Sequence, residues 1–156
     1  MEVKKERIKK LFPWYFSNFE LPIGAREEAI LVYRACKTQK CDKESFTPTF
    51  EEQGCKYFDD DDPSDPSLYS LSTYENPKHI KRFVTMNSEY KKPYKIAKGF
   101  TNPECGLVQR TRERNKNLKK SSHVDWWLYI DARPYESFQI IDDFEAYLEE
   151  YSKKKE

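Results

Sequence analysis

The chain has 156 residues, of which 37% are hydrophobic, 15% aromatic and 35% charged, and its formal net charge is +1. This length is typical of one domain, and the aromatic residues supply enough apolar area to build a core. No apolar run approaches the roughly 18 residues of a membrane span, and the balanced charge indicates no general affinity for nucleic acid or membrane.

The cysteines indicate reduced thiols rather than a metal centre. No Cys-x-x-Cys pair is present, and neither His79 nor His123 stands near a pair of cysteines, so the zinc spacings are missing and no metal is expected. The basic start is followed by Pro13 and aromatic residues rather than by the apolar stretch of a signal peptide. Together these features favour a cytoplasmic protein.

The first third of the chain contains few regular patterns. Residues 1–12 include a possible basic amphipathic helix over 2–12, loosely attached to the rest. Residues 25–36 are expected to begin as a short helix and to continue as a strand over 31–36. Residues 37–67 have the prolines and the run of aspartates typical of a long loop, whose acidic part we interpret as solvated.

The middle of the chain predicts a strand followed by a helix. Residues 67–73 have the composition of a strand. Asn76 then offers a capping side chain immediately before Pro77, which suits the first position of a helix. Ile80, Phe83 and Val84 follow at helical spacing, so a helix is expected over 76–87 with one buried face.

Four strand-like runs follow, over 94–99, 107–111, 123–130 and 138–141. The first two are expected to pair as a hairpin through the turn residues between them. In the third, alternation places His123, Asp125, Trp127 and Tyr129 on one face, which would suit the lining of a cleft. The other face is apolar.

The chain ends in a predicted amphipathic helix over 142–153, in which apolar residues recur at helical spacing behind a possible capping box at Asp142 and Glu145. The elements together predict a single α+β domain over residues 1–156. Its core would be a mixed, mainly antiparallel sheet of about five or six strands flanked by helices.

One set of polar residues falls on predicted strands or at their ends. It consists of Arg34, Ser72 with Thr73, and His123 with Asp125. In this order the chain resembles the Arg-Ser-Glu class of ADP-ribosyltransferases. The resemblance implies that Arg34 holds a phosphate or ribose of NAD, that Ser72 and Thr73 support the site, and that Asp125 stabilises an oxocarbenium-like transition state.

The match to that family has three departures. Tyr74 stands where the family has its second serine, the acid is an aspartate rather than a glutamate, and His123 occupies the place of an upstream glutamate or glutamine. The physical logic of the site still holds in outline. Arg34 would meet a pyrophosphate, Trp127 and Tyr129 a flat ring, and Asp125 a developing positive charge.

Other functions also fit these residues. The basic run that contains Arg110 and Arg112 would contact phosphates of a nucleotide or a nucleic acid, since arginine matches phosphate geometry. Alternatively, the same run is a solvated linker and the acidic loop engages a protein partner. A third hypothesis is a metal-free hydrolase or nuclease that uses His123 and Asp125 as an acid–base pair.

Overall fold

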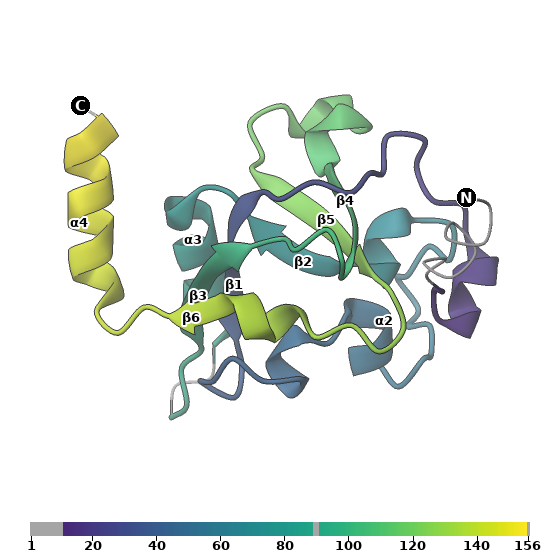
Figure 1. Ribbon diagram of the computed structural model, residues 1–156, viewed down its shortest axis with the longest axis horizontal. Coiled ribbons are helices and arrows are strands. Elements are labelled where there is room, and N and C mark those ends of the chain that lie inside the picture. The colour runs from purple at the N-terminus through teal and green to yellow at the C-terminus, as the bar shows by residue number, and fades with distance from the viewer. Residues whose placement is uncertain (1–10, 89–90, 156) are drawn as a thin grey trace, which may run out of the picture.

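A six-stranded sheet organises the described part of the chain, which in this computed structural model comprises residues 11–88 and 91–155 (Figure 1). The strand order is β4-β5-β2-β1-β3-β6, and every pairing is antiparallel. The strands are β1 (Leu31–Cys36), β2 (Leu71–Tyr74), β3 (Lys95–Phe100), β4 (Gly106–Arg110), β5 (His123–Leu128) and β6 (Phe138–Ile140). The predicted α+β fold is confirmed. The described sheet is antiparallel throughout, however, not mixed.

In the described residues, three α-helices accompany the sheet: α2 (Thr49–Glu52), α3 (Pro77–Asn87) and α4 (Phe144–Lys155). The start of α3 is the predicted one, because the Asn76 side chain accepts a hydrogen bond from the Lys78 backbone N–H at 2.9 Å. The start of α4 differs slightly. Its capping side chain is Asp143, which accepts from the Ala146 N–H at 3.1 Å, rather than Asp142.

Short 3-10 helices occupy several connections. They are η1 (Trp14–Asn18), η2 (Glu44–Phe46), η3 (Pro66–Tyr69), η4 (Thr111–Glu113), η5 (Lys116–Leu118) and η6 (Pro134–Ser137). The segment predicted as a loop over 37–67 therefore carries η2 and α2. The strand predicted over 67–73 is shorter than expected, because its first residues belong to η3, whose start is capped by Asp65.

Two further predictions are wrong. The runs at 94–99 and 107–111 do not pair as a hairpin, since β4 pairs with β5 while β3 lies between β1 and β6. Residues 25–30 form no helix but an extended segment, and Arg26 makes an isolated bridge to Val108 on the edge of β4. The predicted N-terminal helix lies outside the described residues, except for its last two positions.

The sheet is covered on both faces. On one face, Val124 and Trp126 of β5 lie in a fully buried apolar cluster with Val32 and Phe138. On the other, α3 packs over a cluster that contains Tyr33 and Ile96, while η1, α2 and η3 pack around Trp127. The predicted alternation of β5 is confirmed over 123–128, but the face of Asp125 is packed rather than open.

The four cysteines are free thiols, with Cys36 and Cys105 buried and Cys41 and Cys55 half-buried. None of the described helices has the length and apolar character needed to span a membrane.

Candidate functional site

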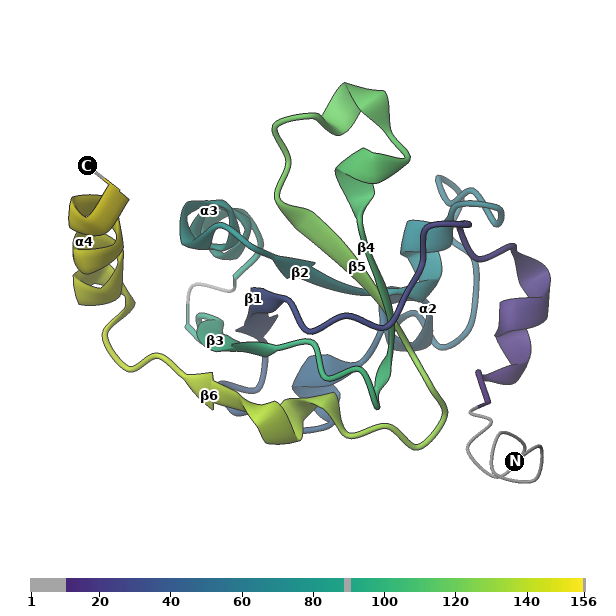
Figure 2. The same cartoon turned by 45° about the horizontal axis from the view of Figure 1, so that its top comes forward.

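The connection between β4 and β5 rises clear of the sheet (Figure 2), and its sequence is rich in arginine and lysine. We call residues 111–122, which carry η4 and η5, the basic projection. Its chain is folded tightly, since the Asn115 side chain accepts from the Asn117 N–H at 3.0 Å and backbone bonds join Leu118 to Asn115 and Ser121 to Leu118. These hydrogen bonds give the projection a defined conformation.

A buried carboxylate, Asp125 of β5, anchors the base of the projection. It is fully buried, and its Oδ1 accepts from the Ser70 hydroxyl at 2.6 Å. Its Oδ2 accepts from the Thr111 hydroxyl at 2.7 Å and lies 2.8 Å from Arg114 Nη1. Burial opposes ionisation, but the positive charge of Arg114 and the hydroxyl donors Ser70 and Thr111 outweigh it and lower the pKa of Asp125. The aspartate thus remains charged while shielded from solvent.

Arg114 ties the projection to three other places in the fold. It donates to the Gln109 side chain at 2.9 Å and to the Ser67 hydroxyl at 2.7 Å, and its guanidinium lies over the Trp127 ring, 5.6 Å from the centroid. With Asp125, these contacts engage both terminal nitrogens of the guanidinium. Arg114 is therefore a structural clamp.

His123 lies beside the same aspartate. Its Nδ1 is 2.5 Å from the Thr111 hydroxyl, and its ring meets the Tyr74 ring edge-on. Because the Thr111 hydroxyl gives its one proton to the ionised Asp125, it accepts from the Nδ1–H of His123, which leaves Nε2 as the acceptor of the neutral ring. Burial lowers the pKa of His123, so the neutral form is favoured.

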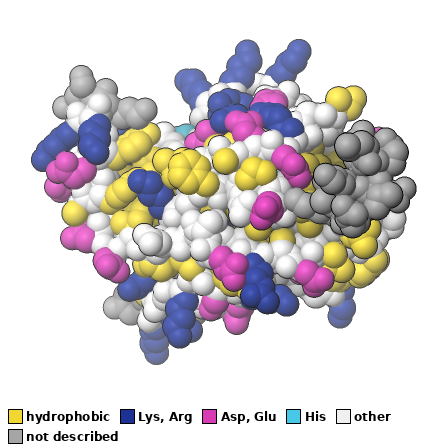
Figure 3. All heavy atoms as spheres, in the orientation of Figure 1, with side chains coloured by type: hydrophobic (Ala, Val, Ile, Leu, Met, Phe, Trp, Pro, Cys, Tyr) yellow, Lys and Arg dark blue, Asp and Glu magenta, His cyan; other side chains and the backbone are white. Residues whose placement is uncertain are grey.

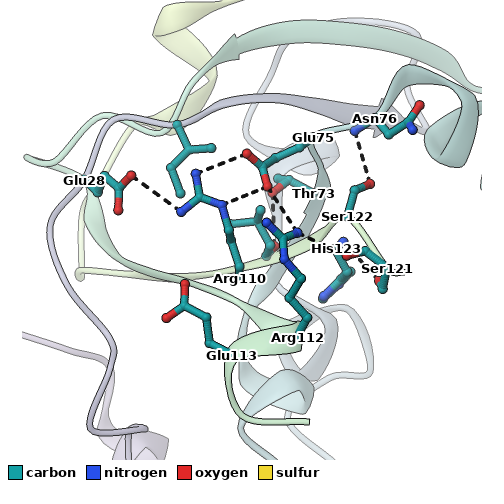
Figure 4. Close-up of polar contacts among 12 residues, drawn as sticks. Glu28, Thr73, Glu75, Asn76, Arg110, Arg112, Glu113, Ser121, Ser122 and His123 are labelled. Carbon is teal, nitrogen blue, oxygen red and sulfur yellow. Dashed lines mark hydrogen bonds and ion pairs between the residues drawn. The ribbon is translucent and has the colours of Figure 1, made fainter. Parts of the chain in front are cut away.

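A second network, on the outer side, neutralises most of the remaining arginines (Figure 4). Arg110 donates to both oxygens of Glu75, at 2.9 and 3.2 Å, and lies 3.6 Å from Glu28. Arg112 lies 3.7 Å from the same Glu75 and donates to the Ser121 carbonyl at 3.2 Å. Glu113 makes a bidentate pair with Arg26. The predicted ligand-binding groups Arg110 and Arg112 are thus already paired within the chain.

The structure does not bring Arg34 into the cluster around Asp125. Along β1, Arg34 alternates with Tyr33 and Ala35, which lie in the cluster under α3, so it takes the face of Val32 and Cys36. It is 7% exposed and donates to the carbonyl oxygens of Ser45 and Ser72, each at 2.9 Å. The guanidinium of Arg34 therefore satisfies two buried backbone carbonyl oxygens, one of them on the neighbouring strand β2.

The other predicted site residues are also occupied internally. Ser72 contributes its carbonyl to Arg34, and the Thr73 hydroxyl donates to the Val124 carbonyl at 3.0 Å. Trp127 is fully buried and donates from Nε1 to the Pro66 carbonyl at 2.9 Å. Tyr129 is half-buried and donates to Glu27 at 3.0 Å.

This arrangement does not fit the expected NAD site. Both groups that would have to touch the cofactor, Arg34 and Asp125, are buried, and their polar atoms are bound by neighbours of the same chain. Among the described residues, no group of histidine, cysteine and carboxylate side chains is placed to hold a metal ion.

Sequence reasoning missed Ser70 and Thr111, which complete the shell of Asp125, and it treated Arg114 only as part of a basic run. Thr111 directly follows β4, whose Arg110 pairs with Val124 between His123 and Asp125, but the sequence did not predict this strand pairing and so gave no signal for Thr111. Comparisons of the chain with family models, curated proteins and solved structures found no match in any of the three.

Proposed function

We propose that this protein binds nucleic acid, and that the lysines at the outer part of the basic projection contact its phosphates. The observation that carries the proposal is that some of the basic side chains of residues 110–120 are ion-paired within the chain and others are not. The arginines are paired at the base, and the exposed outer lysines, Lys116, Lys119 and Lys120, have no carboxylate within ion-pair distance among the described residues.

The paired arginines support this proposal because they fix the projection. An exposed lysine run on a mobile loop would lose conformational freedom on binding, whereas a clamped connection has already lost much of it. Basic side chains gather at the top of the molecule over the projection, above a mixed layer of acidic and basic groups (Figure 3). The free positive charge is therefore local, although the chain as a whole is nearly neutral.

Contact with the backbone is favoured over reading of bases. Trp127, expected to stack on a flat ring, is fully buried, and Tyr94 is half-buried in the cluster under α3. The outer lysines are point charges, and the cation–ring contacts among the described residues involve Lys98 and Arg114 instead, which suits sequence-independent phosphate binding by the lysines. We accordingly expect little preference among base sequences.

The proposal is tested by fluorescence anisotropy with labelled single-stranded and duplex oligonucleotides over a salt series. Each phosphate contact contributes about 0.9 to the slope of log affinity against log salt for duplex DNA, and about 0.7 for single strands. Replacing the three outer lysines by alanine should reduce the magnitude of the slope by about 2 to 3 and weaken binding to every sequence alike.

The matched control replaces Lys56, Lys91 and Lys92, which are also exposed, by alanine. This variant removes the same charge from elsewhere and should keep the slope of the unmodified protein. Equal losses in both triple variants would mean that only net charge matters. Absence of binding at about 50 mM salt would overturn the proposal outright.

A further inference from the structure

A cavity of about 780 Å³ lies at the end of β5 away from the basic projection. It is bounded by η1, by the segment that joins η2 to α2, and by residues 128–135. Of these segments, η1 lies at the end of the molecule opposite α4 (Figure 1), and the other two line the cavity from the side of the sheet. Its volume is within the roughly 300–1,000 Å³ of small-molecule sites. Tyr129, which the sequence predicted as a ligand-binding residue, is part of its lining.

The walls of this cavity are rich in aromatic rings from separate parts of the chain. Trp14 and Tyr15 come from η1, Phe46 from η2, and Tyr129 and Tyr135 from the chain after β5. Trp14 is 69% exposed, whereas the other two tryptophans are fully buried. Aromatic faces bind flat rings by stacking or edge-on contact, and an exposed indole at the rim offers such a face.

The charges around the cavity favour an anion. Lys43 has no carboxylate within ion-pair distance among the described residues. Within the part of the chain that the structure describes, the one carboxylate within ion-pair distance of Arg133 is Glu136, at 3.5 Å, and both side chains of this pair are largely exposed. Two acids also line the cavity, Glu51 and Asp131. Glu51 already accepts a hydrogen bond from the Tyr15 hydroxyl. Among the described residues, Lys43 and the weakly paired Arg133 therefore outnumber Asp131, the one lining acid without such a bond.

We propose that this cavity binds a small planar aromatic anion, with its ring against Trp14 and the neighbouring aromatic walls and its anionic group toward Lys43 and Arg133. The site is separate from the basic projection, so it does not rest on the nucleic-acid proposal. The proposed ligand has both a ring and an anionic group, because the lining contains both aromatic side chains and two cations.

Two matched pairs of probes test this proposal by titration calorimetry: adenosine 5′-monophosphate with adenosine, and naphthalene-2-carboxylate with its amide. At least one anion should bind about tenfold more tightly than its neutral partner, as expected for a charge-assisted hydrogen bond. Inorganic phosphate, which lacks a ring, should not bind measurably. The proposal fails if neither anion binds, or if the neutral analogues bind equally well.

Variants locate the bound probe. Arg133→Ala and Lys43→Ala should each weaken the anion by about tenfold without affecting the neutral analogue. Lys37→Ala, which replaces a lysine outside the lining, should leave both affinities unchanged.

Because Trp14 is the exposed tryptophan, saturation with the probe should also reduce acrylamide quenching of the protein fluorescence. Unchanged quenching would place the probe elsewhere and overturn the site. The triple variant of the outer lysines should bind the probe normally, which separates this test from that of the proposed function.

Discussion

At the scale of single residues, the charge of Asp125 is the interaction on which the base of the projection depends. Asp125→Asn keeps the shape of the side chain but leaves Arg114 facing a neutral amide. Removing one partner of a buried ion pair costs about 3 to 5 kcal/mol, and the partial exposure of Arg114 places the expected loss near the lower value. Urea denaturation should show a lower midpoint with an unchanged m-value.

The control for that substitution is Glu28→Gln, in the outer network. Glu28 pairs with Arg26 and Arg110 but is about one-third exposed, so solvent screens its charge. Exposed pairs of this kind contribute about 0 to 1 kcal/mol. If Asp125→Asn were no more destabilising than Glu28→Gln, the buried network would not be the anchor of the projection.

Residue chemistry alone did not distinguish functional groups from structural ones. Arg34, Asp125 and Trp127 have the types expected of a nucleotide site, yet each is buried and bonded within the chain. Two features of the structure decide that these residues are structural. One is the face of β1 on which Arg34 lies, and the other is the hydrogen bond from Ser70, directly after η3, to Asp125. Both depend on contacts between residues far apart in the sequence, which local patterns do not contain.

At the scale of elements, Gly106 explains why β4 can pair closely with β5. A Cβ at this position would lie 2.0 Å from the Trp127 carbonyl oxygen and 2.9 Å from the Leu128 Cα, so the obstacle is backbone that cannot move aside. Gly106→Ala should therefore destabilise the fold by about 2 kcal/mol or more, as overpacking in a core does. Thermal unfolding with a two-state fit measures the change.

Gly54→Ala is the comparison. Gly54 has a φ of +73° but nothing within 4 Å of an added Cβ, so only the left-handed backbone opposes alanine. That strain costs about 1 to 2 kcal/mol. Gly106→Ala should also lower the hydrogen-exchange protection factors of the backbone amides along β4 and β5, whereas Gly54→Ala should leave them unchanged. Equal protection in the two variants would contradict the role of Gly106.

Elements whose signals are local were predictable. The Asn76–Pro77 start of α3, the alternation of β5 and the apolar spacing of α4 are each set by a few neighbouring residues. Strand pairing was not predictable in the same way. The turn residues between β3 and β4 resemble those of a hairpin, but β4 pairs with β5 instead, where Gly106 leaves room for the Trp127 carbonyl.

For the whole molecule, the buried histidine predicts how stability changes with pH. Burial lowers the pKa of His123 below its ordinary value near 6.5, so between these two pKa values the unfolded chain binds a proton that the folded protein does not. Stability must then fall as the pH falls below about 6.5, by at most about 1.4 kcal/mol per pH unit from this group. Asp125 acts at lower pH, because its folded pKa is depressed below an unfolded value near 4. The range from pH 6.5 to 5 therefore reports mainly on the histidines.

Urea denaturation across that range measures the effect as a slope of unfolding free energy against pH, which is independent of any constant loss caused by a substitution. His123→Gln should flatten the slope. His79→Gln should flatten it less, since His79 also has a lowered pKa but is less buried and bonds only the Ser122 hydroxyl. A slope that survives His123→Gln unchanged would show that the ring is protonated in the folded protein. Asp125 would then balance two cations, His123 and Arg114, instead of Arg114 alone.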